Sequence, residues 1–369
     1  MFIEKLLNVI ISNISNDIDD NYDYYRFGLK SKKKQSIKQK IKRKFKQKIK
    51  YKTIPLNIAC YTNAIRLLSP YYGDLCNLYN MLEDDKSKNL LIQLLAYRIL
   101  GERKIRLPLN TPEYWNGIKK IEELQDSSDY LEAPFVGGQQ ITLYKYNLNK
   151  FSIPIVLYGT ANGAYHSVYV GQYKFKNKDI IIEPKSDDIV LDCGACWGGT
   201  ALFFANDVGE LGHVYSFEFI PKNIEVFRKN LSLNKELEKR ITLVPKPLGI
   251  SSNQKVTCIE NGPGSRIDFD NNVIRSMSLD TISIDDFVDS EQIKVDFIKM
   301  DIEGSELSAL KGAEKTIRKF KPQLAISIYH SMNDFVNIPA WLKSLGLGYK
   351  LYLGHYTIHN EETVIYARM

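Results

Sequence analysis

The hydrophobic positions of the first 130 residues recur at helical spacing. In the stretch 85–101, leucine and isoleucine side chains stand three or four positions apart, as on one face of an α-helix. Ser87 is placed to cap the start of this helix, and Gly101 is placed to end its last turn. The pattern therefore predicts a mainly helical region at 1–130.

Short β-branched and aromatic segments follow, separated by Asn, Gly and Pro. They predict strands at 139–148, 151–159, 166–175 and 178–184. These strands would form a small antiparallel sheet. We therefore expect a small β-rich lead-in at 131–187.

From residue 188 onward, predicted strands alternate with predicted helices. The run 188–194 is continuously apolar, as expected for a parallel strand that is buried on both faces. Further strands are predicted at 212–219, 240–249, 295–301 and 321–330, and a closing hairpin near the carboxyl end. The alternation predicts a doubly wound, Rossmann-like α/β domain at 188–369, which should bind ligands at the carboxyl ends of its strands.

The charge of the chain is concentrated in one segment. Residues 30–52 contain 13 Lys or Arg residues and no acid, whereas the rest of the chain carries 37 basic and 43 acidic residues. Three interpretations of this segment remain open: a solvated connector, attachment to an anionic membrane surface, or contact with nucleic acid. Nucleic acid is the least favoured of the three.

Other features of the chain point to a reducing compartment. The number of cysteines is odd, no cleavable signal is recognisable, and no apolar run reaches the length of a membrane span. We therefore expect a cytoplasmic protein. Peripheral attachment at the inner membrane surface through 30–52 is the alternative.

Two cysteines, Cys193 and Cys196, stand in a Cys-x-x-Cys arrangement. A structural zinc site needs four ligands, and the other three cysteines form no second pair. A thioredoxin-like motif should open a helix, whereas Cys193 ends an apolar strand. We therefore expect neither a metal site nor a redox site at this pair.

The glycines around the two cysteines are more informative. Gly194 and Gly198 stand where a ligand could approach the backbone after a strand. The dinucleotide fingerprint is absent, because Cys196 occupies its second glycine position. Asp192 suits the cationic amino-acid end of S-adenosylmethionine better than a pyrophosphate, and Glu218, at the end of the second strand, can accept both ribose hydroxyls. The pattern predicts a pocket for S-adenosylmethionine.

Four segments of the chain resemble the FkbM family of S-adenosylmethionine-dependent methyltransferases: 188–206, 212–234, 279–287 and 295–317. The string Ile-Lys-x-Asp-x-Glu-Gly-x-Glu at 298–306 is its most specific part. The resemblance runs from about residue 170 to the end, so most of 1–130 lies outside it. It implies a seven-stranded class I methyltransferase sheet and transfer of a methyl group to a hydroxyl of a sugar, glycan, glycolipid-type acceptor or related secondary metabolite.

The resemblance also implies roles for individual residues. The methionine part of the cofactor would lie against Asp192, Gly194, Ala195, Cys196 and Gly198. Glu218 would hold the ribose, and Pro247 and Leu248 would lie near the adenine.

Asp301 and His330 end the fourth and fifth predicted strands of the α/β domain, which should be neighbours in the sheet. His330 is a candidate general base, and Asp301 could orient it, bind the ammonium of the cofactor or serve as a metal ligand. Alternatively, Asp301, Glu303 and His330 could together hold Mg²⁺. Structural roles are equally open: Glu303 could cap a helix, and Lys299 could pair with Asp301.

An O-methyltransferase acting on a small molecule or glycan is the leading hypothesis. The basic segment motivates an RNA or protein methyltransferase as the enzymatic alternative. Base methylases, however, often carry an Asn/Asp-Pro-Pro-Tyr/Phe motif, where this chain has Met-Asp-Ile-Glu-Gly-Ser at 300–305. A protein that binds S-adenosylmethionine without catalysis is the third hypothesis.

Overall fold

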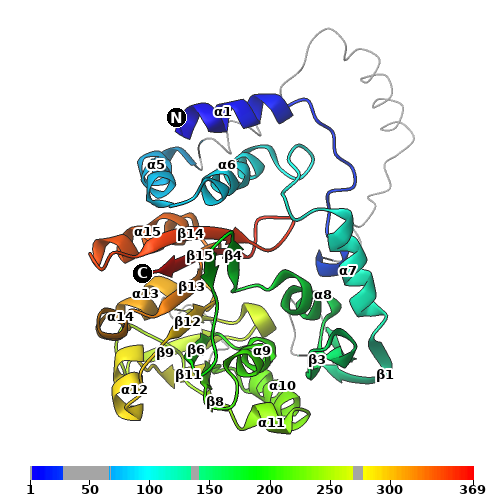
Figure 1. Ribbon diagram of the computed structural model, residues 1–369, viewed down its shortest axis with the longest axis vertical. Helices are drawn as coiled ribbons and strands as arrows, with labels where there is room; N and C mark the ends of the chain where they lie inside the picture. The colour runs from blue at the N-terminus through cyan, green and yellow to red at the C-terminus, as the bar shows by residue number, and fades with distance from the viewer. Residues whose placement is uncertain (1, 28–65, 67, 134–140, 269–276) are drawn as a thin grey trace.

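The computed structural model describes residues 2–27, 66, 68–133, 141–268 and 277–369 (Figure 1). The basic segment 30–52 lies outside the described residues, so its interpretation stays a prediction. No helix in the described part of the chain is both long and apolar enough to cross a membrane.

The structure contains helices along the whole described chain and four separate sheets. The α-helices are α1 (Phe2–Asn13), α2 (Tyr24–Phe27), α5 (Tyr72–Met81), α6 (Asp85–Leu100), α7 (Pro112–Glu122), α8 (Ala161–Tyr165), α9 (Gly199–Val208), α10 (Pro221–Ser232), α11 (Lys235–Glu238), α12 (Ile284–Glu291), α13 (Glu306–Lys311), α14 (Glu314–Phe320) and α15 (Met332–Ser344). Shorter helical turns are η1 (Ser69–Tyr71), η2 (Leu148–Phe151), η3 (His166–Val170) and η4 (Gly262–Gly264). The strands are β1 (Gln125–Glu132), β2 (Thr142–Asn147), β3 (Val156–Gly159), β4 (Phe175–Asn177), β5 (Ile180–Ile182), β6 (Ile189–Cys193), β7 (His213–Phe217), β8 (Ile241–Val244), β9 (Lys255–Ile259), β10 (Arg266–Asp268), β11 (Met277–Asp280), β12 (Phe297–Met300), β13 (Gln323–Ser327), β14 (Lys350–His355) and β15 (Thr363–Arg368).

The predicted doubly wound α/β domain is confirmed. Its seven-stranded sheet has the order β14-β15-β13-β12-β6-β7-β8. The five strands from β13 to β8 are parallel, and β15 pairs antiparallel with both β13 and β14. Four of the five residues of β6 are buried, as its continuous apolar run predicted, and every residue of β12 is buried as well. The carboxyl ends of β6, β7 and β12 therefore meet at one edge of the sheet.

The helical prediction at 85–101 is confirmed, with a different residue at its start. Asp84 caps α6 by accepting a hydrogen bond from the Ser87 backbone N–H, and Gly101 ends the helix with a φ of +81°. Ser87 has another role. Its hydroxyl accepts a hydrogen bond from the Leu353 N–H at 2.9 Å and so ties α6 to β14.

Two predictions for the lead-in were incomplete. The antiparallel sheet β1-β2-β3 is present, but β1 begins at Gln125, inside the region predicted as helical. This strand was not predicted, because its mostly exposed polar residues show no alternation of hydrophobic and polar positions. The segment predicted as a strand at 166–175 instead forms the turn η3, and only its end reaches β4.

The helical region does not stand apart from the α/β domain. One hydrophobic cluster joins apolar side chains of α1, α5 and α6, among them Leu6, Leu78 and Leu91, to those of the sheet and its helices, among them Leu351 and Phe335. In Figure 1, α1, α5 and α6 lie together beyond the β14–β15 hairpin. The helical region thus covers the edge of the sheet that β14 forms.

Candidate active site

The loop between β6 and α9 needs glycine at two positions. Gly194 has a φ of +87°, and a Cβ on it would lie 1.8 Å from the carbonyl oxygen of Asp301. Gly198 has a φ of +81°, and a Cβ there would lie 2.1 Å from the ring of Phe227. The loop therefore packs closely on the end of β12 and on α10, which the sequence did not predict.

A cavity opens at the carboxyl ends of β6, β7 and β12. Its lining comes from the glycine loop, the end of β7, the turn after β8, the segment between β9 and β10, and the loop after β12. The lining residues are Gly194, Cys196, Phe217, Glu218, Phe219, Lys246, Leu248, Gly262, Pro263, Ser265, Ile267, Asp301, Ile302, Glu303 and Ser305. This is where a doubly wound domain binds its ligands.

Glu218 follows the last residue of β7 and carries a nearly buried carboxylate in this cavity. Its Oε1 accepts hydrogen bonds from the backbone N–H groups of Phe219 and Ile220, both at 2.8 Å. Burial raises the pKa of Glu218 to about 7, although these donors and Asn223 favour its ionised form. The side chain is fixed in place and ready to accept hydroxyl donors.

The structure divides the eight predicted cofactor residues into two groups. Gly194, Cys196, Glu218 and Leu248 line the cavity, whereas Asp192, Ala195, Gly198 and Pro247 do not. The latter four are close in the chain to lining residues but do not line the cavity themselves. Their contacts with the cofactor stay predictions.

Asp192 is the most informative member of the second group. Its side chain is completely buried, accepts a hydrogen bond from Thr200 Oγ1 at 2.7 Å, and lies 3.1 Å from Lys299 Nζ. A pairing of Lys299 with Asp301 was one possibility that the sequence left open. Instead, its ammonium group pairs with Asp192 and donates to the carbonyl oxygen of Gly194 at 2.7 Å. Lys299 thus links the Asp192 carboxylate to the backbone of the glycine loop.

The two thiols of the loop are unsuited to thiolate chemistry. Burial raises the pKa of Cys193 and of Cys196, so both remain protonated near neutral pH. Cys193 is completely buried at the end of β6, and Cys196 adopts a φ of +48° in the loop.

Asp301 follows β12 and is the centre of a polar cluster. Tyr173 Oη donates a hydrogen bond to Asp301 Oδ2 at 2.6 Å, and Tyr329 Oη lies 3.3 Å from Oδ1. Burial raises the pKa of Asp301, while His330 and Lys299 oppose that shift. Asp301 is thus held in a single orientation at the cavity wall.

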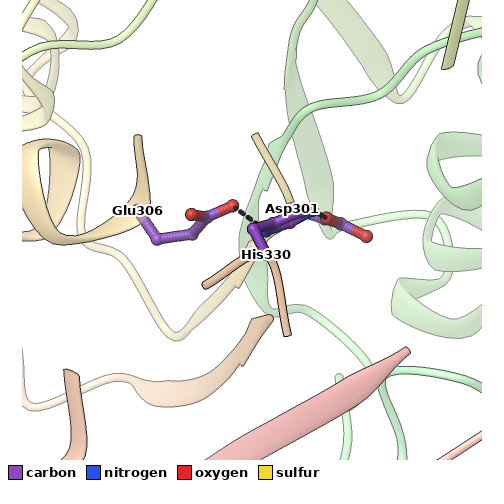
Figure 2. Close-up of side chains that lie close together, drawn as sticks. All are labelled: Asp301, Glu306 and His330. Atoms are coloured by element: carbon purple, nitrogen blue, oxygen red, sulfur yellow. Dashed lines mark ion pairs between the residues drawn. The ribbon is translucent and has the colours of Figure 1, made fainter. Parts of the chain in front are cut away.

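The side chain of His330 lies among three carboxylates, and Figure 2 shows it between two of them, those of Asp301 and Glu306. Its Nε2 is 3.3 Å from Asp301 Oδ1 and 3.5 Å from Glu303 Oε2, and its Nδ1 is 3.2 Å from Glu306 Oε1. Burial lowers the pKa of His330, but the neighbouring carboxylates outweigh it and raise the pKa to about 11. The ring is therefore a cation near neutral pH, which disfavours the predicted role of general base.

The cluster also has the composition of a metal site. Asp301, Glu306 and His330 each offer one ligand atom, and these atoms lie within 4.8 Å of one another. The predicted set contained Glu303 in place of Glu306. Glu306 is completely buried and accepts the backbone N–H groups of Ile302 and Gly304, so its oxygens are already engaged. Neither ring nitrogen of His330 has a partner in hydrogen-bond geometry among the described residues.

Sequence reasoning missed several residues of this site. Tyr173 belongs to the lead-in, and its φ of +70° turns the side chain toward Asp301. Gly262, Pro263, Ser265 and Ile267 lie in a polar stretch that showed no functional pattern. Only the fold places these segments at the cavity, so no sequence signal would have found them.

Comparisons with known proteins find similarity to methyltransferases, and the sequence match lies within the α/β domain. Residues 192–351 match the sequence model described as the Methyltransferase FkbM domain. The structure of methyltransferase FkbM from Methylobacillus flagellatus KT is 24% identical with a TM-score of 0.51, and the match covers 81% of this chain and 59% of that one. This chain thus spans less than two thirds of that structure. No curated protein matches the sequence.

Two more distant structures are also similar. Precorrin-6y C5,15-methyltransferase from Geobacter metallireducens GS-15 is 14% identical with a TM-score of 0.34, and the match covers 50% of this chain and 82% of that one. Fibrillarin from Aeropyrum pernix, in complex with natively bound S-adenosyl-L-methionine, is 14% identical with a TM-score of 0.33, and the match covers 65% and 99%.

The likeness to the Methylobacillus protein confirms the expected class I methyltransferase fold. Residues 192–351, a little under half of the chain, are similar in sequence to the FkbM methyltransferase domain.

Proposed function

We propose that this protein is an S-adenosylmethionine-dependent methyltransferase that methylates a hydroxyl group of a sugar, glycan, glycolipid-type acceptor or related secondary metabolite. The cavity at the carboxyl ends of β6 and β7, with the Glu218 carboxylate inside it, is the observation that carries the proposal. The match of residues 192–351 to the FkbM methyltransferase domain supports the reaction class.

The residues of the cavity fit the cofactor. Gly194 lines the cavity, and its lack of a side chain lets the loop pack directly against the carbonyl group of Asp301, another lining residue. Glu218 would accept the two ribose hydroxyls, and Leu248 would lie against the adenine. The bound cofactor would supply an electrophilic methyl group on its sulfonium.

The other polar groups of the site belong to the acceptor side. The acceptor hydroxyl must lose its proton as the methyl group is transferred. Asp301 lines the cavity, whereas His330 does not, so the geometry favours the Asp301 carboxylate as the group that orients or accepts this proton. Tyr173 and His330 hold the carboxylate for that role.

Cofactor binding is the decisive test. Calorimetry should show saturable binding of S-adenosylmethionine and none of NAD. Glu218→Gln should weaken binding of the cofactor and of adenosine by tenfold or more, because the ribose hydroxyls lose a charged acceptor, worth about 1.5–3 kcal/mol. A wild-type protein that binds NAD and not S-adenosylmethionine would overturn the proposal.

The same measurement has an internal control in its pH dependence. The carboxylate form of Glu218 is the one that accepts hydroxyl donors, and its pKa is about 7. Adenosine affinity should therefore rise between pH 6 and pH 8 in the wild type and stay flat in Glu218→Gln.

We also propose that the site holds a divalent cation such as Mg²⁺, which on binding would displace the proton that His330 carries near neutral pH. Asp301 and Glu303 face Nε2 of His330, while Nδ1 faces Glu306, which is how a ligating histidine is commonly oriented by a neighbouring carboxylate. Carboxylate oxygens suit Mg²⁺, and the imidazole also suits Mn²⁺. A bound cation would lower the pKa of an acceptor hydroxyl.

Metal binding can be tested without knowing the acceptor. Titration with Mn²⁺, followed by electron paramagnetic resonance, should show one site that Mg²⁺ displaces. Glu303→Gln should weaken it by about tenfold or more, in the range seen when metal-site residues are altered. Glu225→Gln, at an exposed carboxylate of α10, is the matched control. Equal Mn²⁺ affinity in the wild type and both variants would refute the metal site.

A further inference from the structure

An insert between β8 and β12 reaches the cofactor cavity. Its strands form a separate three-stranded sheet of order β10-β9-β11. Four residues between β9 and the end of β10 line the cavity: Gly262, Pro263, Ser265 and Ile267. The insert is thus part of the cavity wall as well as a surface elaboration of the fold.

The turn that carries these residues is fixed by hydrogen bonds to a single carbonyl group. The carbonyl oxygen of Gly262 accepts from Ser265 Oγ at 2.6 Å within the turn. It also accepts from Asn223 Nδ2, in the first turn of α10, at 3.1 Å. The wall is therefore attached to the methyltransferase domain through Asn223.

Asn223 reaches two further parts of the cavity. Its Oδ1 accepts a hydrogen bond from Trp197 Nε1 at 3.1 Å, and Trp197 directly follows Cys196 in the glycine loop. Its side chain also interacts with the Glu218 carboxylate and favours the ionised form of that group. Only 1% of Asn223 is exposed, so these protein groups take up its hydrogen-bonding capacity.

The chemistry of the wall matches one half of the proposed cofactor. Pro263 and Ile267 face the cavity together with Leu248 and offer apolar surface, which suits the flat face of a purine. The hydroxyl-binding Glu218 is linked to the same wall through Asn223. Asp301 and Glu303, which also line the cavity, follow β12 and so are not part of this apolar wall.

We propose that residues 262–267 form the outer wall of a purine-nucleoside subsite, and that Asn223 is the positioning residue that holds this wall, Trp197 and Glu218 in register. The inference rests on the proposed function, and it assigns the binding of the cofactor's nucleoside half to the insert. Asn223 acts through its neighbours and makes no contact with the ligand itself.

The experiment measures calorimetric affinity for adenosine and for S-adenosylhomocysteine in five proteins. Ile267→Ala removes apolar wall surface, and Asn223→Ala releases the wall. Leu279→Ala lies in β11 of the same insert and outside the cavity lining. Asn234→Ala removes a buried asparagine that binds the backbone of Val156 in β3. The wild type completes the set.

Both wall variants should lose on the order of tenfold in affinity for each ligand, as expected for about 1.4 kcal/mol of lost contact. Because the loss falls on the nucleoside half, the ratio of the two affinities should stay constant. Both control variants should bind within about twofold of the wild type. In Asn223→Ala the tryptophan emission should also shift, since the Trp197 indole loses its acceptor, and Asn234→Ala should leave it unchanged.

The outcomes separate this inference from the proposed function. A wild-type protein that binds neither ligand contradicts the proposed function itself. A wild type that binds, with Ile267→Ala and Asn223→Ala binding equally well, overturns the nucleoside wall alone. If Asn223→Ala does not fold, Ile267→Ala against Leu279→Ala decides the matter.

Discussion

At the residue scale, the glycine loop shows how little space separates its backbone from β12. Gly194 lies at the carboxyl end of β6, and a side chain there would enter the carbonyl group of Asp301. Gly199, five residues later, has no heavy atom within 4 Å of a Cβ and begins α9. A side chain is therefore excluded at Gly194 and has room at Gly199, although the two glycines are only five residues apart in the sequence.

This difference gives a matched pair of substitutions. Gly194→Ala should abolish cofactor binding and lower the free energy of unfolding, because it adds a collision to a positive φ. Gly199→Ala should bind normally and be stabilised by up to about 1 kcal/mol, since alanine is the better helix former. Calorimetry and urea unfolding measure both, and normal cofactor binding by Gly194→Ala would contradict the assignment.

At the element scale, strand register decides which charges meet. Parallel pairing of β6 with β12 puts Asp192 beside Lys299. The next residue beyond β12, Asp301, is then free to face Tyr173 and His330. The sequence predicted both strands, but their pairing and its parallel register, between segments about 100 residues apart, are set by packing.

The Asp192–Lys299 pair should behave as a buried ion pair. Lys299→Met should lower the free energy of unfolding by about 3–5 kcal/mol, because it leaves the Asp192 carboxylate buried without its partner. Asp192→Asn with Lys299→Met should cost less than the two single changes added together. Guanidinium unfolding of all four proteins tests this coupling, and additive losses would show that the two groups act independently.

At the scale of the whole molecule, the helical region and the lead-in complete the methyltransferase domain. The cluster that joins α1, α5 and α6 to the sheet is continuous with the core under β12 and β13. Tyr173, from the lead-in, supplies a hydrogen bond to the candidate catalytic carboxylate. The parts outside residues 192–351 therefore contribute to both stability and the site.

Long-range polar contacts reinforce this organisation. Tyr97 of α6 hydrogen bonds to His359, whose other ring nitrogen accepts the backbone N–H of Asp23. Arg26 of α2 pairs with Glu362, which also accepts a hydrogen bond from Gln172. Hydrogen bonds and an ion pair thus connect the amino-terminal segment to the β14–β15 hairpin, at the buried residues His359 and Glu362.

The sequence by itself determined the α/β class and the edge of the sheet at which the cavity lies, with Gly194, Glu218 and Asp301 among its lining residues. It could do so because strand burial, glycine spacing and strand ends are local properties of the chain. Only the tertiary structure decided that Asp192 pairs with Lys299, that His330 lies among three carboxylates, and that Tyr173 and the insert reach the site. These contacts join segments that are far apart in the chain, and packing alone brings them together.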